Sequence, residues 1–212
     1  MHKPINILVL ASGNGTNLQA LLDAEAAGKM RSESAADGKI ALVVSDRHDA
    51  YALQRARLAG IPAIIIDMDG NTGREERRQL LSDRILNLAE EYRIDLIVFA
   101  GFLWVLKGKL IETYAGRMIN LHPALLPKYG GKGMFGEHVH KAVLAAREKE
   151  SGCTVHLVDA GTDTGSILLQ RKVPVQPDDT PDSLAEKIHI EEHIAIVDAV
   201  IIMLKRLGGN VR

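Results

Sequence analysis

The sequence predicts an α/β fold: an open, doubly wound, mostly parallel sheet with a long C-terminal helix. Short runs that are apolar throughout alternate with longer segments whose apolar residues recur at three- and four-residue steps. The first pattern is typical of strands covered on both faces, and the second is typical of the helices that cover them. A longer helical pattern continues unbroken over residues 179–209.

The first half of the chain alternates strictly between strands and helices. This βαβαβαβ order is that of a doubly wound half-sheet. Two of the helical segments end in glycine, which stops a helix. Residues 30–38 are expected to form a surface excursion. The strands are expected at residues 5–10, 40–45, 62–67 and 95–101, and the helices at 16–28, 50–60 and 74–93.

The second half of the chain extends the sheet and closes it with a helix. Thr180 can cap that last helix, Pro181 fits its first turn and Gly208 ends it. No repeat or linker interrupts the pattern, so a single domain over residues 1–212 is expected. The remaining elements are expected as a helix at 106–114, a strand at 117–122, a glycine-rich loop at 130–136, a helix at 136–148, and strands at 153–159 and 166–175 around a turn.

Composition excludes several classes of protein. Apolar residues make up 46% of the chain and charged residues 25%, with a net charge of −1. These are ordinary values for a globular domain and lack the basic footprint of a nucleic-acid binder. The single Cys153 cannot form an internal disulfide, and no apolar run is long enough for a membrane span or a signal peptide. We therefore expect a cytoplasmic protein.

The loop ASGNG precedes the first predicted helix and is a candidate anion site. Glycines let the backbone approach a ligand, and a helix N-terminus offers free N–H groups. The motif is not a Walker A loop. It is half a dinucleotide fingerprint, because Gly13 and Gly15 fit but Leu18 holds the third glycine position, while Asp46 is placed to serve a ribose. A plain strand-to-helix turn is the alternative.

Asn120 and His122 are two positions apart on a predicted strand. Their side chains therefore share one face, and Leu121 points to the other. They lie at the carboxyl end of the strand, where open α/β sheets build their sites. An imidazole can move a proton and an amide can donate to an oxyanion, a pair suited to attack on a carbonyl. A histidine bonded only to backbone is the alternative.

The turn VDAGTDTG carries two carboxylates, Asp159 and Asp163. A carboxylate near a histidine orients it and stabilises its charged form. Because Asp and Gly also favour turns for conformational reasons, simple turn chemistry is the alternative.

The stretch HIEEH, residues 189–193, matches an H-x-x-E-H zinc pattern. Only 19 residues follow it, and none of them is His, Cys or Glu, so a third ligand would have to be Asp198 on the same helix. A catalytic zinc needs three placed ligands, so an exposed helix is preferred over a metal site.

Four further residues have structural interpretations. His138 and His140 either line the glycine-rich loop or face solvent. His156, which alternates with apolar residues, is expected to be buried and hydrogen-bonded. Cys153 is expected to be a small core residue, since no basic neighbour in the sequence activates it.

Together these motifs resemble the folate-dependent formyltransferases, in particular the phosphoribosylglycinamide formyltransferase branch. The resemblance extends from about residue 5 to residue 207. It rests on SGNGTNLQAL, AGFLWVL, INLHPALLPKYGG, HVHKAV and VHLVDAGTDTGSILLQ. It implies formyl transfer from 10-formyltetrahydrofolate, as co-substrate, to glycinamide ribonucleotide in purine biosynthesis. It implies no metal and no nucleic-acid or membrane partner, and it allows a homodimer.

The resemblance also implies a role for each site residue. His122 is the acid/base, Asn120 supports the tetrahedral intermediate, and Asp163 rather than Asp159 is the acid beside the histidine. The implied ribonucleotide contacts are Gly15, Thr16 and Asn17 at the phosphate, with His189 and Glu192 as the far wall. The implied folate contacts are Arg74 at the carboxylate, with Leu103, Trp104, Val105, Leu106, Asn120 and Asp159 at the pterin.

Two features depart from the commoner family pattern. Trp104 stands where relatives often carry a basic residue, and the loop over residues 129–137 is longer. A formyltetrahydrofolate hydrolase and a methionyl-tRNA formyltransferase are rival members, each of which would need a further domain. From another class, a nucleotide-binding regulatory protein that uses only the glycine loop is the alternative.

Overall fold

The computed structural model describes residues 3–31, 37–68 and 73–209. Within these residues, seven strands form one sheet in the order β3-β2-β1-β4-β5-β6-β7. Strands β1 to β5 are parallel, and β6 and β7 are antiparallel to their neighbours. The open, doubly wound, mostly parallel sheet with a long C-terminal helix is therefore confirmed. The single domain over residues 1–212 stays a prediction.

The bounds of the elements follow the predicted alternation closely. The strands are β1 (Ile5–Leu10), β2 (Gly38–Ser45), β3 (Ala63–Ile65), β4 (Leu96–Phe99), β5 (Met118–His122), β6 (Glu150–Leu157) and β7 (Ile167–Pro174). The helices are α1 (Thr16–Ala26), α2 (Tyr51–Leu58), α3 (Arg74–Glu91), α4 (Lys109–Thr113), α5 (Glu137–Ala145) and α6 (Pro181–Gly208).

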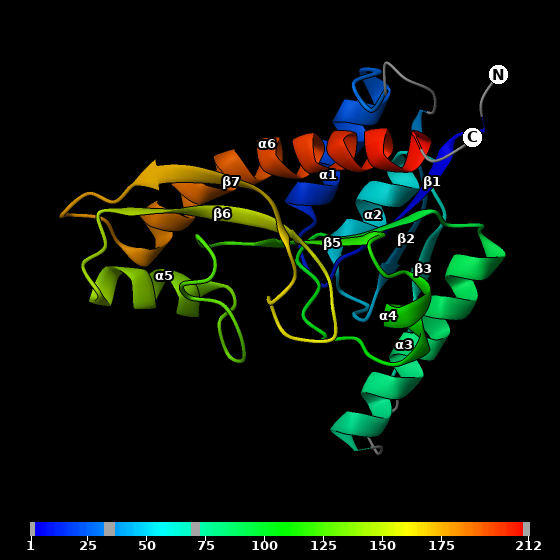
Figure 1. Cartoon of the computed structure of the whole chain (residues 1–212), viewed down its shortest axis with the longest axis horizontal. Coiled ribbons are helices and arrows are strands. Elements are labelled where there is room, and N and C mark those ends of the chain that lie inside the picture. The colour runs from blue at the N-terminus through cyan, green and yellow to red at the C-terminus, as the bar shows by residue number, and fades with distance from the viewer. Residues whose placement is uncertain (1–2, 32–36, 69–72, 210–212) are drawn as a thin grey trace.

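Two apolar cores lie on the two faces of the sheet, as the fully apolar strands require. In β1, Ile7 and Val9 belong to the core shared with α1, α2 and α6. Leu8 and Leu10 belong to the core shared with α3 and α4. Figure 1 shows α6 along one side of the sheet and α3 with α4 on the other. Each strand therefore alternates between two buried surfaces rather than between core and water.

Some predicted elements are longer than the observed ones. The strand predicted at 62–67 is only Ala63–Ile65, and the one predicted at 95–101 ends at Phe99. The helix predicted at 106–114 is only Lys109–Thr113, because Gly108 enters it with a φ of 67°. Of the surface excursion predicted at 30–38, residues 32–36 lie outside the described part of the chain.

The C-terminal helix begins and ends as predicted. The Thr180 side chain accepts from the Ser183 N–H, the Ser183 hydroxyl bonds the Thr180 N–H, and Pro181 is the first helical residue. α6 packs against α1, α5, β1, β6 and β7 and so crosses much of the molecule. Among the described residues, no helix combines the length and apolar character that a membrane span needs.

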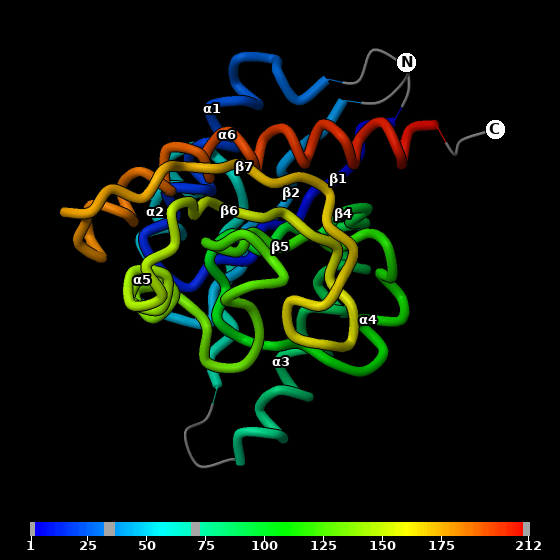
Figure 2. Tube along the Cα trace, turned by 60° about the vertical axis from the view of Figure 1, so that its left-hand side comes forward, coloured from blue at the N-terminus to red at the C-terminus, as the bar shows by residue number. Residues whose placement is uncertain are grey.

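The sheet places several loops at the carboxyl ends of its parallel strands. The loops after β4, β5 and β6 lie between α5 on one side and α3 with α4 on the other (Figure 1, Figure 2). β5 is the last parallel strand, and its antiparallel partner β6 ends beside the start of β5, where Leu157 pairs with Ile119. The β6–β7 loop turns back from there, so that Asp163 reaches Asn120 and His122. This topology gathers the candidate residues into one region.

Candidate active site

A cleft of about 490 Å³ opens at this edge of the sheet. Its walls are the segment after β4 (residues 101–106), the end of β5 (residues 120–123), residues 131–136 of the glycine-rich loop with the start of α5, and the β6–β7 loop (residues 158–163). Helix α6 and the start of α1 add the remaining wall. Large apolar clefts with a few converging polar groups are the usual form of ligand sites.

Asn120 and His122 lie on one face of β5 and both line the cleft, as predicted. Leu121 packs into the core on the opposite face. The His122 ring is 4% exposed, so it is available only from the cleft. Its Nε2 donates to the Tyr129 carbonyl at 2.8 Å. The structure therefore brings the amide and the imidazole together in one site. The alternative, a histidine bonded only to backbone, accounts for Nε2 but not for Nδ1.

Asp163 brings the β6–β7 loop to the same site. One carboxylate oxygen lies 3.6 Å from His122 Nδ1 and accepts from the Gly131 N–H at 3.0 Å. The other lies 3.4 Å from the Asn120 amide nitrogen and 3.5 Å from His156 Nε2. A residue far from β5 in sequence thus contacts both predicted site residues.

The pKa of Asp163 lies below the ordinary value for an aspartate. Burial alone would raise the pKa, but the contact with His156, the hydrogen bond from the Gly131 N–H and the proximity of His122 outweigh it. The carboxyl group therefore stays ionised at neutral pH. Asp163 also has a φ of 57°, an unusual conformation for a residue other than glycine, which aims its side chain into the cleft.

His156 is a site residue that the sequence interpretation missed. It is buried and hydrogen-bonded, as predicted, because its Nδ1 donates to the Leu157 carbonyl at 2.8 Å. That bond leaves Nε2 as the acceptor for the Asn120 amide at 3.1 Å. The antiparallel register pairs Asn120 directly with His156. His156 therefore orients the amide that the predicted carbonyl chemistry needs.

At one end of the cleft, Asn17 and Glu192 lie together. The Asn17 amide nitrogen is 3.4 Å from Glu192, and His189 Nδ1 is 2.7 Å from the same carboxylate oxygen. That hydrogen bond raises the pKa of His189. The Asn17 side-chain oxygen is buried without a partner. Of the predicted phosphate residues only Asn17 lines the cleft, while Gly15 and Thr16 lie behind it at the start of α1.

Helix α1 begins without a side-chain cap. Gly15 stands at the N-cap with a φ of 74°, and a Cβ there would lie 2.7 Å from Ala52 Cβ. Only glycine fits this turn, and its missing side chain leaves the first N–H groups of the helix uncapped. The plain-turn interpretation accounts for Gly15 but not for Gly13, where a Cβ would meet nothing within 4 Å.

The residues predicted to bind folate also line the cleft. These are Arg74, Leu103, Trp104, Val105, Leu106 and Asp159. The Trp104 indole donates to Asp46 at 2.9 Å, and the other Asp46 oxygen accepts from the Ser12 hydroxyl at 2.6 Å. Both Asp46 oxygens thus hold the segment that carries Trp104, and Asp46 is not among the residues that line the cleft, so its role as a ribose ligand stays a prediction.

Asp159 supports its own turn. Its carboxylate accepts from the Gly161 N–H at 2.9 Å and from the Thr164 hydroxyl at 2.7 Å. The turn chemistry considered for this residue is present, and the residue still lines the cleft. Cys153 is fully buried, as predicted, and burial raises the pKa of its thiol to about 12.

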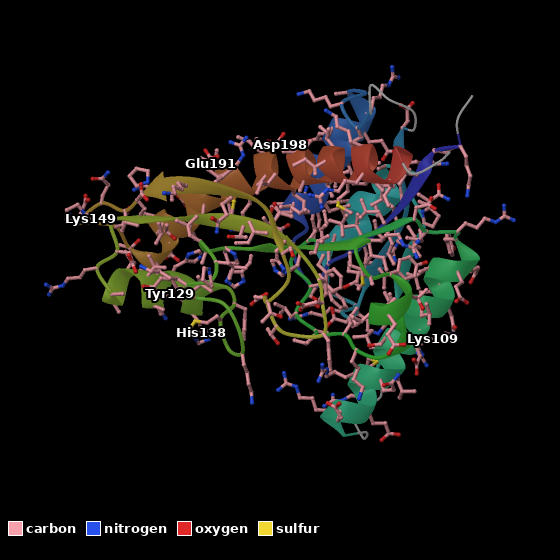
Figure 3. All side chains as sticks on the ribbon, in the orientation of Figure 1. Lys109, Tyr129, His138, Lys149, Glu191 and Asp198 are labelled. Atoms are coloured by element: carbon pink, nitrogen blue, oxygen red, sulfur yellow. The ribbon has the colours of Figure 1, made fainter. Side chains whose placement is uncertain are left out.

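The exposed-helix interpretation of HIEEH is wrong for Glu192, which is 4% exposed. Its neighbour Glu191 lies on the outer side of α6 with Asp198, away from the loops (Figure 3), and both pair with Arg171. The sequence alone does not show that Glu192 is buried, because its burial depends on how α6 packs against α1 and α5. Among the described residues, no group of three His, Cys, Asp or Glu side chains is arranged to hold a metal ion.

The two histidines of the glycine-rich segment differ. His138 is exposed and stacks edge to face with Phe135. His140 is 5% exposed and lines the cleft from α5. Only the second of them therefore belongs to the site.

The fold and the cluster define an open α/β protein with an imidazole, an amide and a carboxylate at the carboxyl ends of its strands. Residues 5–200 match the model of the formyl transferase family, and the chain belongs to this family. The resemblance to the formyltransferases is thus confirmed.

Named relatives cover nearly the whole chain. The trifunctional purine biosynthetic protein adenosine-3 of Drosophila melanogaster is 44% identical over 93% of this chain and 14% of its own length. The chain therefore spans about a seventh of the first curated relatives it matches. The phosphoribosylglycinamide formyltransferase of Escherichia coli (strain K12) is 38% identical over 93% of this chain and 85% of its own length.

Solved structures agree with this assignment. Glycinamide ribonucleotide transformylase 1 from Symbiobacterium toebii superposes with a TM-score of 0.83 at 37% identity, covering 96% of this chain and 89% of that one. The corresponding enzyme from Geobacillus kaustophilus also gives 0.83, at 32% identity, covering 95% of this chain and all of that one.

Proposed function

We propose that this chain transfers the formyl group of 10-formyltetrahydrofolate to the amine of glycinamide ribonucleotide, in purine biosynthesis. Membership of the formyl transferase family and the names of the relatives support this proposal. The observation that carries it is the Asp163 carboxylate, which lies within 3.6 Å of His122 and 3.4 Å of Asn120 in one cleft. That cluster is suited to stabilising a negatively charged oxygen and moving a proton.

The first step is attack of the substrate amine on the formyl carbon, which forms a C–N bond and a tetrahedral oxyanion. One Asn120 N–H makes the shorter bond to His156, and the other makes only a 3.4 Å contact with Asp163. The second N–H is therefore the one available to the oxyanion. The His122 Nε2–H, held by Tyr129 in the free protein, exchanges that carbonyl for the oxyanion.

The second step breaks the bond between the formyl carbon and the folate nitrogen. The amine loses a proton when it becomes an amide, and the departing folate nitrogen gains one, so the reaction is balanced without an external acid. His122 relays this proton, and Asp163 stabilises the imidazolium form of His122 during the step. No step of this scheme uses a metal.

The two ends of the cleft take the two substrates. Asn17, with Gly15 and Thr16 behind it, binds the phosphate at the uncapped start of α1, where N–H groups and the helix dipole favour an anion. Glu192 and His189 bind the ribose side. Arg74 binds the folate carboxylate, and residues 103–106 with Asp159 enclose the pterin. The cytoplasmic location and a homodimer stay predictions.

Absorbance-monitored transfer from a 10-formylfolate analogue tests the proposal. We expect release of the deformylated folate only when glycinamide ribonucleotide is present. Release without the ribonucleotide would identify a hydrolase. A thermal shift with NAD and none with either proposed substrate would favour the nucleotide-binding regulator instead.

A further inference from the structure

Trp104 is the only tryptophan of the chain, and hydrogen bonds fix its ring at the wall of the cleft. The indole N–H donates to Asp46 at 2.9 Å, and the other Asp46 oxygen accepts from the Ser12 hydroxyl at 2.6 Å. The same hydroxyl accepts from the N–H of Leu103, the residue before Trp104, at 3.1 Å. Both the side chain and the backbone of this segment are therefore bonded to residues that follow β1 and β2, so the ring has little freedom to turn.

The start of α3 lies against the same ring. The Arg77 guanidinium lies over the Trp104 ring, 5.9 Å from its centroid, a distance at which a cation and an aromatic ring attract each other. The next residue, Arg78, donates to the Val105 carbonyl at 2.6 Å. Arg74, which also lines the cleft, precedes these two arginines by three and four positions and therefore shares their side of the helix. The Trp104 ring thus lies on the side of α3 that carries Arg74.

We propose that Trp104 is a specificity-determining residue for the folate, and that its indole packs against the aminobenzoyl ring in the middle of that molecule. The inference rests on the proposed function, which places the folate carboxylate at Arg74. The aminobenzoyl ring is bonded directly to the glutamate that carries this carboxylate, whereas the pterin lies beyond it. The aromatic ring of the ligand that comes next to Arg74 is therefore the aminobenzoyl ring.

The surface that Trp104 offers to a ligand is apolar. The residue is partly buried against the core and still lines the cleft, and its one polar atom, the indole nitrogen, is already bonded to Asp46. A pterin carries several polar nitrogens and an oxygen, which would lose their bonds to water against such a surface, whereas a benzene ring needs only packing. Aromatic pairs gain free energy beyond the burial of their area, and a ring that is fixed beforehand loses little conformational freedom on binding.

Two ligands isolate this contact. One is a non-reactive folate analogue that keeps the aminobenzoyl ring, and the other has a saturated cyclohexane ring in its place, with the same bicyclic group and the same carboxylates. Each is titrated by calorimetry into the wild type, Trp104→Phe, Trp104→Leu and Tyr51→Leu. Tyr51 provides the matched control, because it is an exposed aromatic residue beneath the Arg55 guanidinium, 4.8 Å from its ring centroid, and does not line the cleft.

We expect the wild type, Trp104→Phe and Tyr51→Leu to prefer the aromatic analogue by about two- to tenfold, the usual worth of an aromatic pair. Trp104→Leu should lose this preference, and its KM for the folate should rise while its KM for the ribonucleotide stays that of the wild type. Because Trp104 is the only tryptophan, its fluorescence gives an independent measurement. The bound folate analogue should protect the indole from quenching by acrylamide, and bound glycinamide ribonucleotide should not.

Three results would overturn the inference. A wild type that binds both analogues equally makes no aromatic contact with the middle ring. If Trp104→Leu keeps the preference, other residues select the ring, and where that variant fails to fold, acrylamide quenching of the wild type that is unchanged by the bound folate analogue leads to the same conclusion. A wild type that binds glycinamide ribonucleotide but neither folate analogue would defeat the proposed function itself, and this inference with it.

Discussion

Asp163 connects three side chains of the site, so its charge is the first residue-scale test. Asp163→Asn keeps the shape and removes the negative charge beside His122. We expect a folded protein that binds both substrates and loses about two to four powers of ten in turnover, the usual worth of positioned acid/base chemistry. Steady-state kinetics and circular dichroism measure both properties.

Asp159→Asn is the matched control, because Asp159 bonds only within its own turn. Its turnover should fall far less than that of Asp163→Asn, and any effect of its place in the pterin wall should appear in the folate KM instead. Equal turnover in the two variants would remove Asp163 from the mechanism.

Gly15 offers a second residue-scale prediction, about stability. Gly15→Ala must adopt a φ of 74° and place its Cβ 2.7 Å from that of Ala52. We expect a loss of about 1–3 kcal/mol in the free energy of unfolding, the usual cost of such strain. Urea denaturation measures it. Gly13→Ala, which meets nothing within 4 Å, should change stability by less than about 0.5 kcal/mol. A larger loss at Gly13 would show that the turn is restrained elsewhere.

At the scale of residues, the sequence predicts the site residues whose arrangement is set by their neighbours in the chain. Asn120 and His122 share a face because strand geometry has a period of two. Asp163 was assigned through the family resemblance, since its contact depends on how a distant loop returns to the cleft. His156 was predicted as buried but not as the partner of Asn120, because the antiparallel register between β5 and β6 is a long-range property. The sequence leaves the place of His140 undecided for the same reason.

At the scale of elements, the start of α6 gives a prediction about pH. Hydrogen bonds from Lys187, the Gln176 N–H and Ser183 hold the pKa of Asp179 at about 2. A carboxyl group whose pKa is lower in the folded chain contributes stability above its unfolded pKa and loses it as the pH falls through the folded value. We expect about 1–2 kcal/mol, allowing for solvent screening, to be lost between about pH 4 and pH 2.

Urea unfolding of the wild type and Asp179→Asn over that pH range checks this expectation. The variant should be less stable at pH 7 and show a smaller loss on acidification. Thr180→Ala serves as the control for the cap alone, with a loss of about 1 kcal/mol that does not depend on pH. Parallel pH curves for wild type and Asp179→Asn would mean that the ion pair contributes nothing.

Element bounds were predictable where a cap or a long periodic run marks them. The three signals for the bounds of α6, namely Thr180, Pro181 and Gly208, are all confirmed. Residues 106–108 of the helix predicted at 106–114 are not helical, because Gly108 enters α4 with a φ of 67° and Leu106 belongs to the cleft wall instead. A helical pattern and a cleft-lining loop look alike when only the spacing of apolar residues is known.

At the scale of the whole molecule, Cys153 reports on global opening. Its burial, together with the charge of Glu192, raises the pKa of the thiol to about 12, so thiolate is scarce near neutral pH. We expect a disulfide reagent to react negligibly with the native protein at pH 8 and at once in urea. Reaction rates across a urea series should follow the unfolding curve. Fast, stoichiometric labelling without denaturant would contradict the buried position.

The sheet as a whole was predicted in class but not in full order. The fully apolar runs and the βαβ alternation indicated parallel strands with helices packed on both faces. β6 follows β5 through α5 and runs antiparallel to it, and β7 follows β6 through the loop over residues 158–166 and runs antiparallel to β6. The consequence for function is large, since the β6–β7 loop leaves beside the start of β5 and Asp163 reaches back from it to Asn120 and His122.

The long helix gives the cleft two walls of unequal rigidity. Glu192 lies within a 28-residue helix that packs on four other elements and on β1, whereas residues 101–106 and 131–136 have little regular structure. Backbone amides in the middle of α6 should exchange their hydrogens slowest, and those of the two loops fastest. Uniform exchange, read by mass spectrometry, would contradict this. With one rigid wall and one looser wall, the proposed ribonucleotide would meet a preformed surface on α6, whereas the proposed folate would have to order the loops that surround it. Folate analogues with different ring systems should therefore be accommodated far more readily than ribonucleotides with altered sugars.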